Sequence, residues 1–147
     1  MVIDKAVALV VRPSDRGREL LVFRHPLAGV QVPKGTVEPG EPIADAVLRE
    51  LHEESGLAFG YRPRAIGHWD RVLDGGEVHR WHLFLIDAPD GLADEWTHEA
   101  TGSVEEEGLA FAFHWLPLDA GLPGSLEPLF APCAEALLAA QVAGDCA

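Results

Sequence analysis

The sequence predicts an α/β fold in which a mixed sheet lies between helices. Residues 6–12 are a continuous β-branched and aliphatic run, typical of a strand buried on both faces, and residues 19–25 read as the returning strand. Residues 42–55 carry apolar side chains at helical spacing, and a last helix is expected to start near Pro132. With no linker or internal repeat between these segments, we expect a single domain over residues 1–147.

The remaining elements follow from short extended runs and turn residues. Residues 30–33 form an extended piece that Pro33 stops, and runs 62–73 and 78–87 flank Asp74-Gly75, a dipeptide typical of hairpins. Residues 88–103 are expected to be a loop, in which Trp96 anchors the chain to the core or helps to close over a ligand. Residues 109–115 alternate apolar with small or polar side chains, as in a half-buried strand, and residues 126–130 are expected to form a turn.

The composition is that of a globular protein with an acidic surface. The hydrophobic fraction of 48% excludes a disordered chain, and the net charge of −13 disfavours a nucleic-acid polymer or an anionic membrane as partner. A small phosphorylated substrate, such as a nucleotide, stays compatible if metal and local basic residues neutralise it. Cys133 and Cys146 have no metal-type spacing, and neither a basic leader nor a run of transmembrane length is present. We therefore expect a cytoplasmic protein with free thiols, and a homodimer stays open.

Carboxylates crowd onto the predicted helix at 42–55. Pro42 suits the first helical position and Gly56 the left-handed residue after the last turn. Glu50, Glu53 and Glu54 then stand at i, i+3 and i+4, on one face. Carboxylates about 6 Å apart repel by roughly 2 to 3 kcal/mol per pair at an effective dielectric near 20. A solvated acidic face is the alternative for the helix alone, but a divalent cation would offset this repulsion, and an all-oxygen ligand set suits Mg²⁺ or Mn²⁺ better than zinc.

The whole stretch 35–57 resembles the Nudix box. Gly35 is followed after five residues by Glu41, and after seven more by Arg-Glu-Leu-His-Glu-Glu-Ser-Gly-Leu at 49–57. A match of this length is not expected by chance at ordinary residue frequencies. The resemblance implies an α/β/α Nudix sandwich and Mg²⁺-dependent hydrolysis of a nucleoside diphosphate linked to another group, X.

The resemblance also implies roles for the charged residues of the box. Glu53 and Glu54 are the surest metal ligands, and Glu50 would bind metal or help to activate the attacking water. Arg49, four residues before Glu53, would orient a glutamate by a charge-assisted hydrogen bond. Glu41 would contribute through water or by holding the loop.

Members of this family often draw a further carboxylate, a ligand or a base, from a later loop. Glu105, Glu106 and Glu107 precede the late strand at about the right place, and Glu99 is a rival. The sequence does not choose among them; we take Glu107 as the working candidate for a metal ligand.

Substrate anions need positive partners in so acidic a chain. Lys34 beside the loop and Arg24 on the preceding strand are the expected phosphate contacts, and Gly35 would let the loop turn tightly above the helix. The seven histidines are expected to be surface or satisfied polar groups.

The group X stays open. Pro33-Lys34-Gly35 resembles the lead-in of members acting on dinucleoside polyphosphates or diphosphoinositol polyphosphates, and a nucleoside triphosphate is equally compatible. A nucleotide-binding sensor of Nudix fold without hydrolysis is the alternative, although such domains commonly have eroded boxes. A Nudix-fold isomerase would need its own cysteine, and Cys133 in a terminal helix is a poor candidate.

Overall fold

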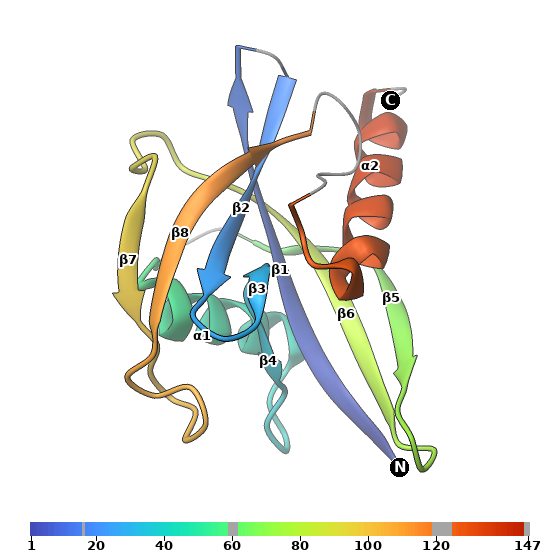
Figure 1. Ribbon diagram of the computed structural model, residues 1–147. Coiled ribbons are helices and arrows are strands. Elements are labelled where there is room, and N and C mark those ends of the chain that lie inside the picture. Colours follow the sequence, from blue (N-terminus) through green and yellow to red (C-terminus); the bar gives the residue numbers. More distant parts are fainter. Residues whose placement is uncertain (16, 59–61, 119–124, 146–147) are drawn as a thin grey trace.

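A mixed sheet forms the centre of the molecule, and a helix packs on each of its faces (Figure 1). The computed structural model describes residues 1–15, 17–58, 62–118 and 125–145, and over these ranges the sheet has eight strands. Its strand order is β5-β6-β1-β2-β8-β7, with β3 beside β2 and β4 beside β1. This arrangement confirms the expected α/β sandwich with a mixed sheet.

The elements lie close to the ranges expected from the sequence. The strands are β1 (Val2–Ser14), β2 (Gly17–His25), β3 (Gly29–Gln31), β4 (Lys34–Thr36), β5 (Arg64–Val72), β6 (Val78–Asp87), β7 (Trp96–Glu99) and β8 (Ala110–Pro117). The helices are α1 (Ile43–Ser55), the short 3₁₀ helix η1 (Pro128–Phe130) and α2 (Ala131–Asp145). Strand β1 runs parallel to β6 and antiparallel to β2 and β4.

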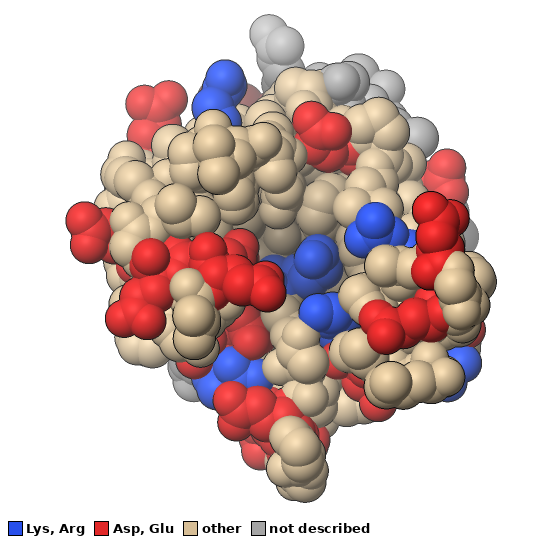
Figure 2. Space-filling view, turned by 60° about the horizontal axis from the view of Figure 1, so that its bottom comes forward, with Lys and Arg blue, Asp and Glu red and all other residues tan. Residues whose placement is uncertain are grey.

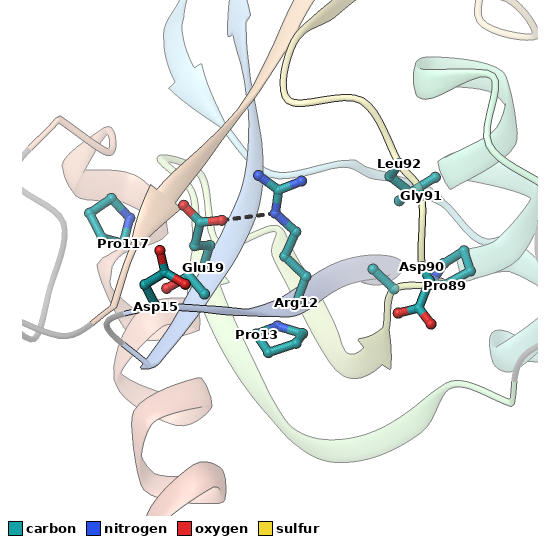
Figure 3. A pocket seen from close by; sticks show the side chains of 11 residues that line it. Arg12, Pro13, Asp15, Glu19, Pro89, Asp90, Gly91, Leu92 and Pro117 are labelled. Carbon is teal, nitrogen blue, oxygen red and sulfur yellow. Dashed lines mark hydrogen bonds and ion pairs between the residues drawn. The ribbon is translucent and has the colours of Figure 1, made fainter.

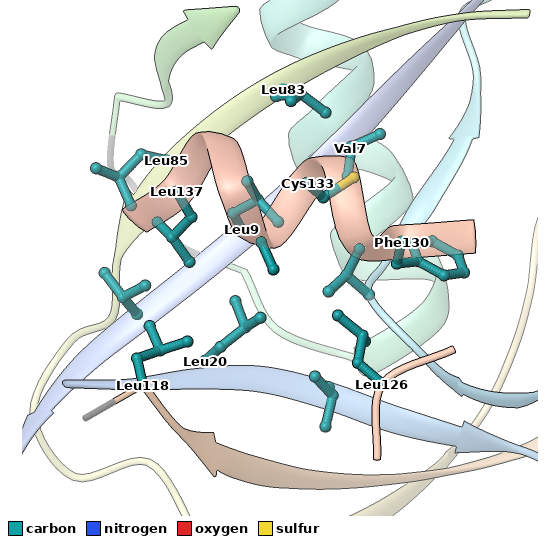
Figure 4. Packing of buried hydrophobic residues seen from close by; sticks show 14 of the residues in the cluster. Val7, Leu9, Leu20, Leu83, Leu85, Leu118, Leu126, Phe130, Cys133 and Leu137 are labelled. Atoms are coloured by element: carbon teal, nitrogen blue, oxygen red, sulfur yellow. The ribbon is translucent and has the colours of Figure 1, made fainter. Parts of the chain in front are cut away.

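Strand β1 is buried on both faces because each face has its own helix. Val7 and Leu9 point to the side of α2, where they join a core that includes Leu137 (Figure 4). Ala8 and Val10 point to the side of α1. Alternation along a strand therefore explains the continuous apolar run, since neither face of this strand meets water.

Helix α1 begins one residue after the predicted start and ends at the predicted residue. Pro42 occupies the N-cap with φ −59°, and Gly56 adopts a left-handed φ of 80° while its N–H donates to His52 O at 2.8 Å. Val47 and Leu51 are buried against the sheet. The helix is thus anchored on one face, and its other face lies beside β4 and the loops.

Strand β7 corrects the expectation of a loop throughout residues 88–103. Its residues Trp96–Glu99 pair antiparallel with β8. A strand of four residues is too short to show a clear period-two pattern, so the pairing partner defines it. Cys146 lies outside the described residues, and no described helix is long and apolar enough to cross a membrane.

We expect Leu137→Ala to lower the free energy of unfolding by about 2 to 5 kcal/mol, because it opens a cavity in the core under α2. Urea unfolding followed by circular dichroism measures this loss. The exposed neighbour Glu135 provides the control, since Glu135→Ala should change stability by no more than about 0.5 kcal/mol. A loss below about 1 kcal/mol for Leu137→Ala would contradict the packing of α2 described above.

Candidate active site

The Arg49 guanidinium is the centre of a charged network where the loop before α1 meets the helix. It binds both carboxylate oxygens of Glu41, through Nε at 2.8 Å and Nη2 at 2.9 Å. Its Nη1 donates to Glu50 at 2.8 Å and to Glu53 at 3.2 Å, and Nη2 also donates to Thr36 O at 3.0 Å. The predicted pair between Arg49 and Glu53 is therefore present, and the same guanidinium also orients Glu50.

Glu41 holds the loop in this network. Its hydrogen bonds from Arg49 and from the Glu38 N–H lower the pKa of its carboxyl group to about 2. Glu41 was expected to act through water or to hold the loop. Its contacts with Arg49 and Glu38 are those of a residue that holds the loop.

Glu50 and Glu54 are buried, with 8% and 3% of their surfaces exposed. Burial raises the pKa of both carboxyl groups, and the negative charge of Glu106 raises them further. The Lys34 N–H donates to Glu54 Oε2 at 3.0 Å, which partly offsets the effect at that residue. Keeping these carboxylates ionised costs free energy that a nearby cation would reduce.

This donor set fits a hard divalent cation. It consists of carboxylate oxygens from Glu50, Glu53, Glu54 and Glu106, three of them carried on α1. Among the described residues, no three acidic, histidine or cysteine side chains close on a point that could hold a metal by themselves. Arg49 draws Glu50 and Glu53 toward itself, and Mg²⁺ sites commonly rely on one or two carboxylates, water and substrate phosphates.

Two glycines make room for the glutamates. A Cβ atom on Gly35 would overlap the carboxylate of Glu50, and one on Gly102 would overlap that of Glu53. Gly102 also has a φ of 81°, which favours glycine. The glycine at the start of the box is thus explained by close approach of a side chain.

A cleft of about 510 Å³ opens beside this network. Figure 2 shows the corresponding hollow, where Lys and Arg side chains lie in the middle and Asp and Glu side chains surround them. The cleft is lined by His25 and by the charged residues Lys5, Lys34, Glu38, Arg49, Glu50, Glu105 and Glu106. The cleft therefore combines carboxylates with amines, as a phosphate-binding metal site requires.

The structure brings Lys34 and Gly35 to the cleft but not Arg24. Side chains alternate along β2, so that Phe23 and His25 face the side of α1, where both rings contact Phe111. Arg24 consequently points to the other side and lines a separate pocket.

Glu106, rather than the working candidate Glu107, lies close to the buried carboxylates. Glu106 lines the cleft and acts electrostatically on Glu50 and Glu54, whereas Glu107 does not line it. Glu99 is exposed on β7. The turn over residues 103–108 brings Glu105 and Glu106 to the cleft and leaves Glu107 outside it, and the sequence does not encode that choice locally.

His25 is a cleft residue that the sequence reasoning passed over. Its Nδ1 accepts the Leu27 N–H at 3.0 Å, so the neutral ring carries its hydrogen on Nε2, which lies 3.9 Å from Glu106. The alternation of residues 19–25 could have placed this ring on the same face as Phe23.

A larger hollow of about 620 Å³ lies elsewhere, between the end of β1 and residues 88–92 (Figure 3). Its Arg12 donates to Glu19 at 2.8 Å and to Asp94 at 2.8 Å. Among the described residues that line this hollow, none belongs to the stretch 35–57, and the one cation, Arg12, is already paired. The cleft beside Arg49 is therefore the candidate active site.

Comparison with known proteins identifies the family. The family model of the NUDIX domain matches residues 3–137. The chain belongs to the Nudix family. This membership and the enzyme class expected from the sequence, a Nudix hydrolase, are confirmed.

Curated relatives of this Nudix hydrolase are distant in sequence. The uncharacterized Nudix hydrolase YvcI of Bacillus subtilis (strain 168) is 27% identical over 107 residues, covering 71% of this chain and 62% of that protein. An RNA pyrophosphohydrolase of Marinomonas sp. (strain MWYL1) is 27% identical over 124 residues, covering 74% of this chain and 75% of that protein. The chain thus spans less than two thirds of the length of YvcI.

Solved structures share the whole architecture. A MutT NUDIX hydrolase from Burkholderia pseudomallei superposes with a TM-score of 0.67 at 25% identity, covering 93% of this chain and 98% of that one. The Ap4A hydrolase of C. elegans superposes with a TM-score of 0.62 at 19% identity, covering 95% of this chain and 98% of that one. At this identity the likeness supports the fold alone.

The ion pair between Glu41 and Arg49 should make the stability of this Nudix hydrolase pH-dependent in acid. The pKa of Glu41 is about 2 in the folded state, below its ordinary value of 4.5. Its contribution is present above about pH 4.5 and is lost as the pH falls toward 2. We therefore expect the stability difference between wild type and Glu41→Gln, measured by urea unfolding, to shrink between about pH 5 and pH 2.5.

An Arg49→Ala background is the control for this experiment. Because Arg49 is the main cause of the shift, the stability change caused by Glu41→Gln should be nearly independent of pH in that background. A wild-type difference that stays constant down to about pH 2.5 would contradict the assigned ion pair.

Proposed function

We propose that this Nudix hydrolase cleaves the pyrophosphate linkage of a nucleoside diphosphate linked to X, with Mg²⁺ or Mn²⁺ as cofactor. The observation that carries the proposal is the Arg49 network, in which one guanidinium anchored by Glu41 holds both Glu53 and Glu50, and Glu50 lines the cleft. A purely structural ion pair between Arg49 and Glu41 would not need the two further carboxylates of Glu50 and Glu53, which are buried and half-buried.

Glu53 and Glu54 would hold the cation, with Glu50 and Glu106 beside them. When bound, the cation supplies positive charge to the phosphate oxygens and to the leaving oxygen of the pyrophosphate. The protein's part is to keep these carboxylates ionised and correctly spaced, which the contacts of Arg49 and the Lys34 N–H support.

Glu50 would accept a proton from an attacking water. It lines the cleft, and its Oε1 is held by Arg49 at 2.8 Å, so its second oxygen is left for the water. General bases act through such a fixed carboxylate at hydrogen-bond distance. Arg49 is then a positioning residue for both Glu50 and Glu53.

Lys34 is the principal phosphate contact in this proposal. Its Nζ lies 5.1 Å from the centroid of the Trp81 ring and, within the described residues, makes neither a hydrogen bond nor an ion pair. Burial lowers the pKa of this amine, as expected for a poorly hydrated ammonium. A phosphate oxygen would supply the acceptor that the ammonium lacks.

A small nucleotide is the substrate class that the charge favours. The net charge of −13 opposes approach of a long polyanion, whereas the cleft provides local lysines for a few phosphates. We therefore propose a nucleoside triphosphate or a dinucleoside polyphosphate as the substrate. We also predict that RNA is not a substrate, which needs its own test because the Marinomonas relative is named an RNA pyrophosphohydrolase.

Phosphate and pyrophosphate release from a panel of substrates tests this function. The panel contains nucleoside triphosphates, dinucleoside polyphosphates, nucleotide sugars and a 5′-triphosphorylated RNA, each with Mg²⁺ or Mn²⁺. We expect turnover of at least one small nucleotide and its loss with a chelator. Tight nucleotide binding with no turnover of any substrate would instead support a sensor without hydrolysis.

We expect Glu53→Gln to lower kcat by about 100-fold or more, since it removes a charged ligand from the proposed metal site. Its unfolding midpoint should stay near that of the wild type, because Glu53 is only half-buried. Glu99→Gln, on the exposed side of β7, is the matched control and should keep full activity. Unchanged turnover in Glu53→Gln would remove Glu53 from the site.

A further inference from the structure

The C-terminal turn of α1 is tied to strand β7 and the segment that follows it by four hydrogen bonds. The last carbonyls of a helix have no partner within the helix, so their partners show what the helix end packs against. Trp96 Nε1 donates to Ser55 O at 3.0 Å, and His98 Nδ1 donates to Glu54 O at 3.1 Å. Thr101 donates to Glu53 O through its backbone N–H at 3.0 Å and through Oγ1 at 3.4 Å. Two of these carbonyls belong to the residues proposed to bind metal.

The two side-chain donors of β7 come from one face of the strand. Trp96 and His98 alternate with the exposed Thr97, and the Trp96 ring stacks on Phe113 at 5.1 Å with an interplanar angle of 8°. The Glu54 carbonyl can only accept, so His98 carries a hydrogen on Nδ1. The His98 ring also covers Gly56, where a Cβ atom would lie 2.8 Å from its Cδ2.

The same strand leads directly into the loop that completes the cleft. The loop is closed by the Ala100 N–H to Leu109 O at 2.9 Å and the Gly108 N–H to Ala100 O at 3.0 Å. Between these bonds it carries Gly102, against the Glu53 carboxylate, and Glu106. Strand β7 therefore holds the end of α1 and the start of this loop at once.

We propose that His98 and Trp96 are positioning residues of the active site. By binding the last carbonyls of α1, they set the carboxylates of Glu53 and Glu54 against the loop that carries Glu106. The expected effect on turnover rests on the proposed function, whereas the effect on cation affinity does not depend on which substrate is used. Misplacement of a catalytic group by about 1 Å can lower a rate about 100-fold, so a hydrogen bond remote from the chemistry matters.

Replacing the ring of His98 separates hydrogen bonding from simple packing. His98→Leu removes the donor, whereas His98→Asn places an amide N–H near the position of Nδ1. Thr97→Ala alters the opposite face of β7, and Leu137→Ala destabilises the protein from the far side of the sheet. These two variants control for changes in the strand and for loss of stability.

Electron paramagnetic resonance of free Mn²⁺ provides the main readout, with kcat measured beside it. We expect His98→Leu to weaken Mn²⁺ binding by about 10-fold and His98→Asn to stay within about 3-fold of the wild type. Both control variants should bind Mn²⁺ as the wild type does. Trp96→Phe keeps the stacking on Phe113 but removes Nε1, so it should also weaken Mn²⁺ binding. This variant replaces His98→Leu in the test if His98→Leu does not fold.

Several results would overturn the proposal. One is a wild-type Mn²⁺ affinity in both His98→Leu and Trp96→Phe. Another is an equal loss of Mn²⁺ affinity in His98→Leu and His98→Asn. A third is a loss of Mn²⁺ affinity in Leu137→Ala as large as that in His98→Leu. A wild-type protein that does not bind Mn²⁺ would overturn it too. Weaker Mn²⁺ binding in His98→Leu, together with a wild type that turns over no substrate, would support the positioning role and contradict only the proposed hydrolysis.

Discussion

The hydrogen bonds of the Arg49 guanidinium are the interaction on which the site depends. Without them, Glu41, Glu50 and Glu53 would repel one another at a few ångströms, and the loop before α1 would lose its link to the helix. Charge-assisted bonds of this kind are roughly twice as strong as neutral ones. The same cation that stabilises the loop also sets the direction of two carboxylates, so stability and site geometry rest on one side chain.

Helix α1 carries this network because its two faces have different tasks. Val47 and Leu51 pack against the sheet, and the face with Arg49 and Glu53 stays beside the loops. The apolar face prevents rotation of the helix, and the hydrogen bonds from β7 hold its C-terminal turn. A carboxylate on such a helix has little freedom, which reduces the entropy lost when a ligand orders it.

The cleft reconciles an acidic protein with an anionic substrate. The protein carries a net charge of −13, yet Lys5 and Lys34 both reach the same cleft as Arg49. Arg49 is already neutralised by its carboxylates, so the two lysines are, among the described residues that line the cleft, the amines left for phosphate. The buried carboxylate of Glu50 and the poorly hydrated amine of Lys34 in one cleft favour ligands that bring both a cation and phosphate groups.

The sequence by itself determined α1, the buried strands, the Nudix family and the pairing of Arg49 with Glu53, because these depend on spacing, capping residues and alternation over a few neighbouring positions. Strand β7, the inward turn of Glu106, the outward direction of Arg24 and the place of His25 were decided only by the tertiary structure. Each of these depends on which strand lies next to which, or on the turn of a loop held at both ends. Such contacts join residues far apart in the chain, and no local pattern records them.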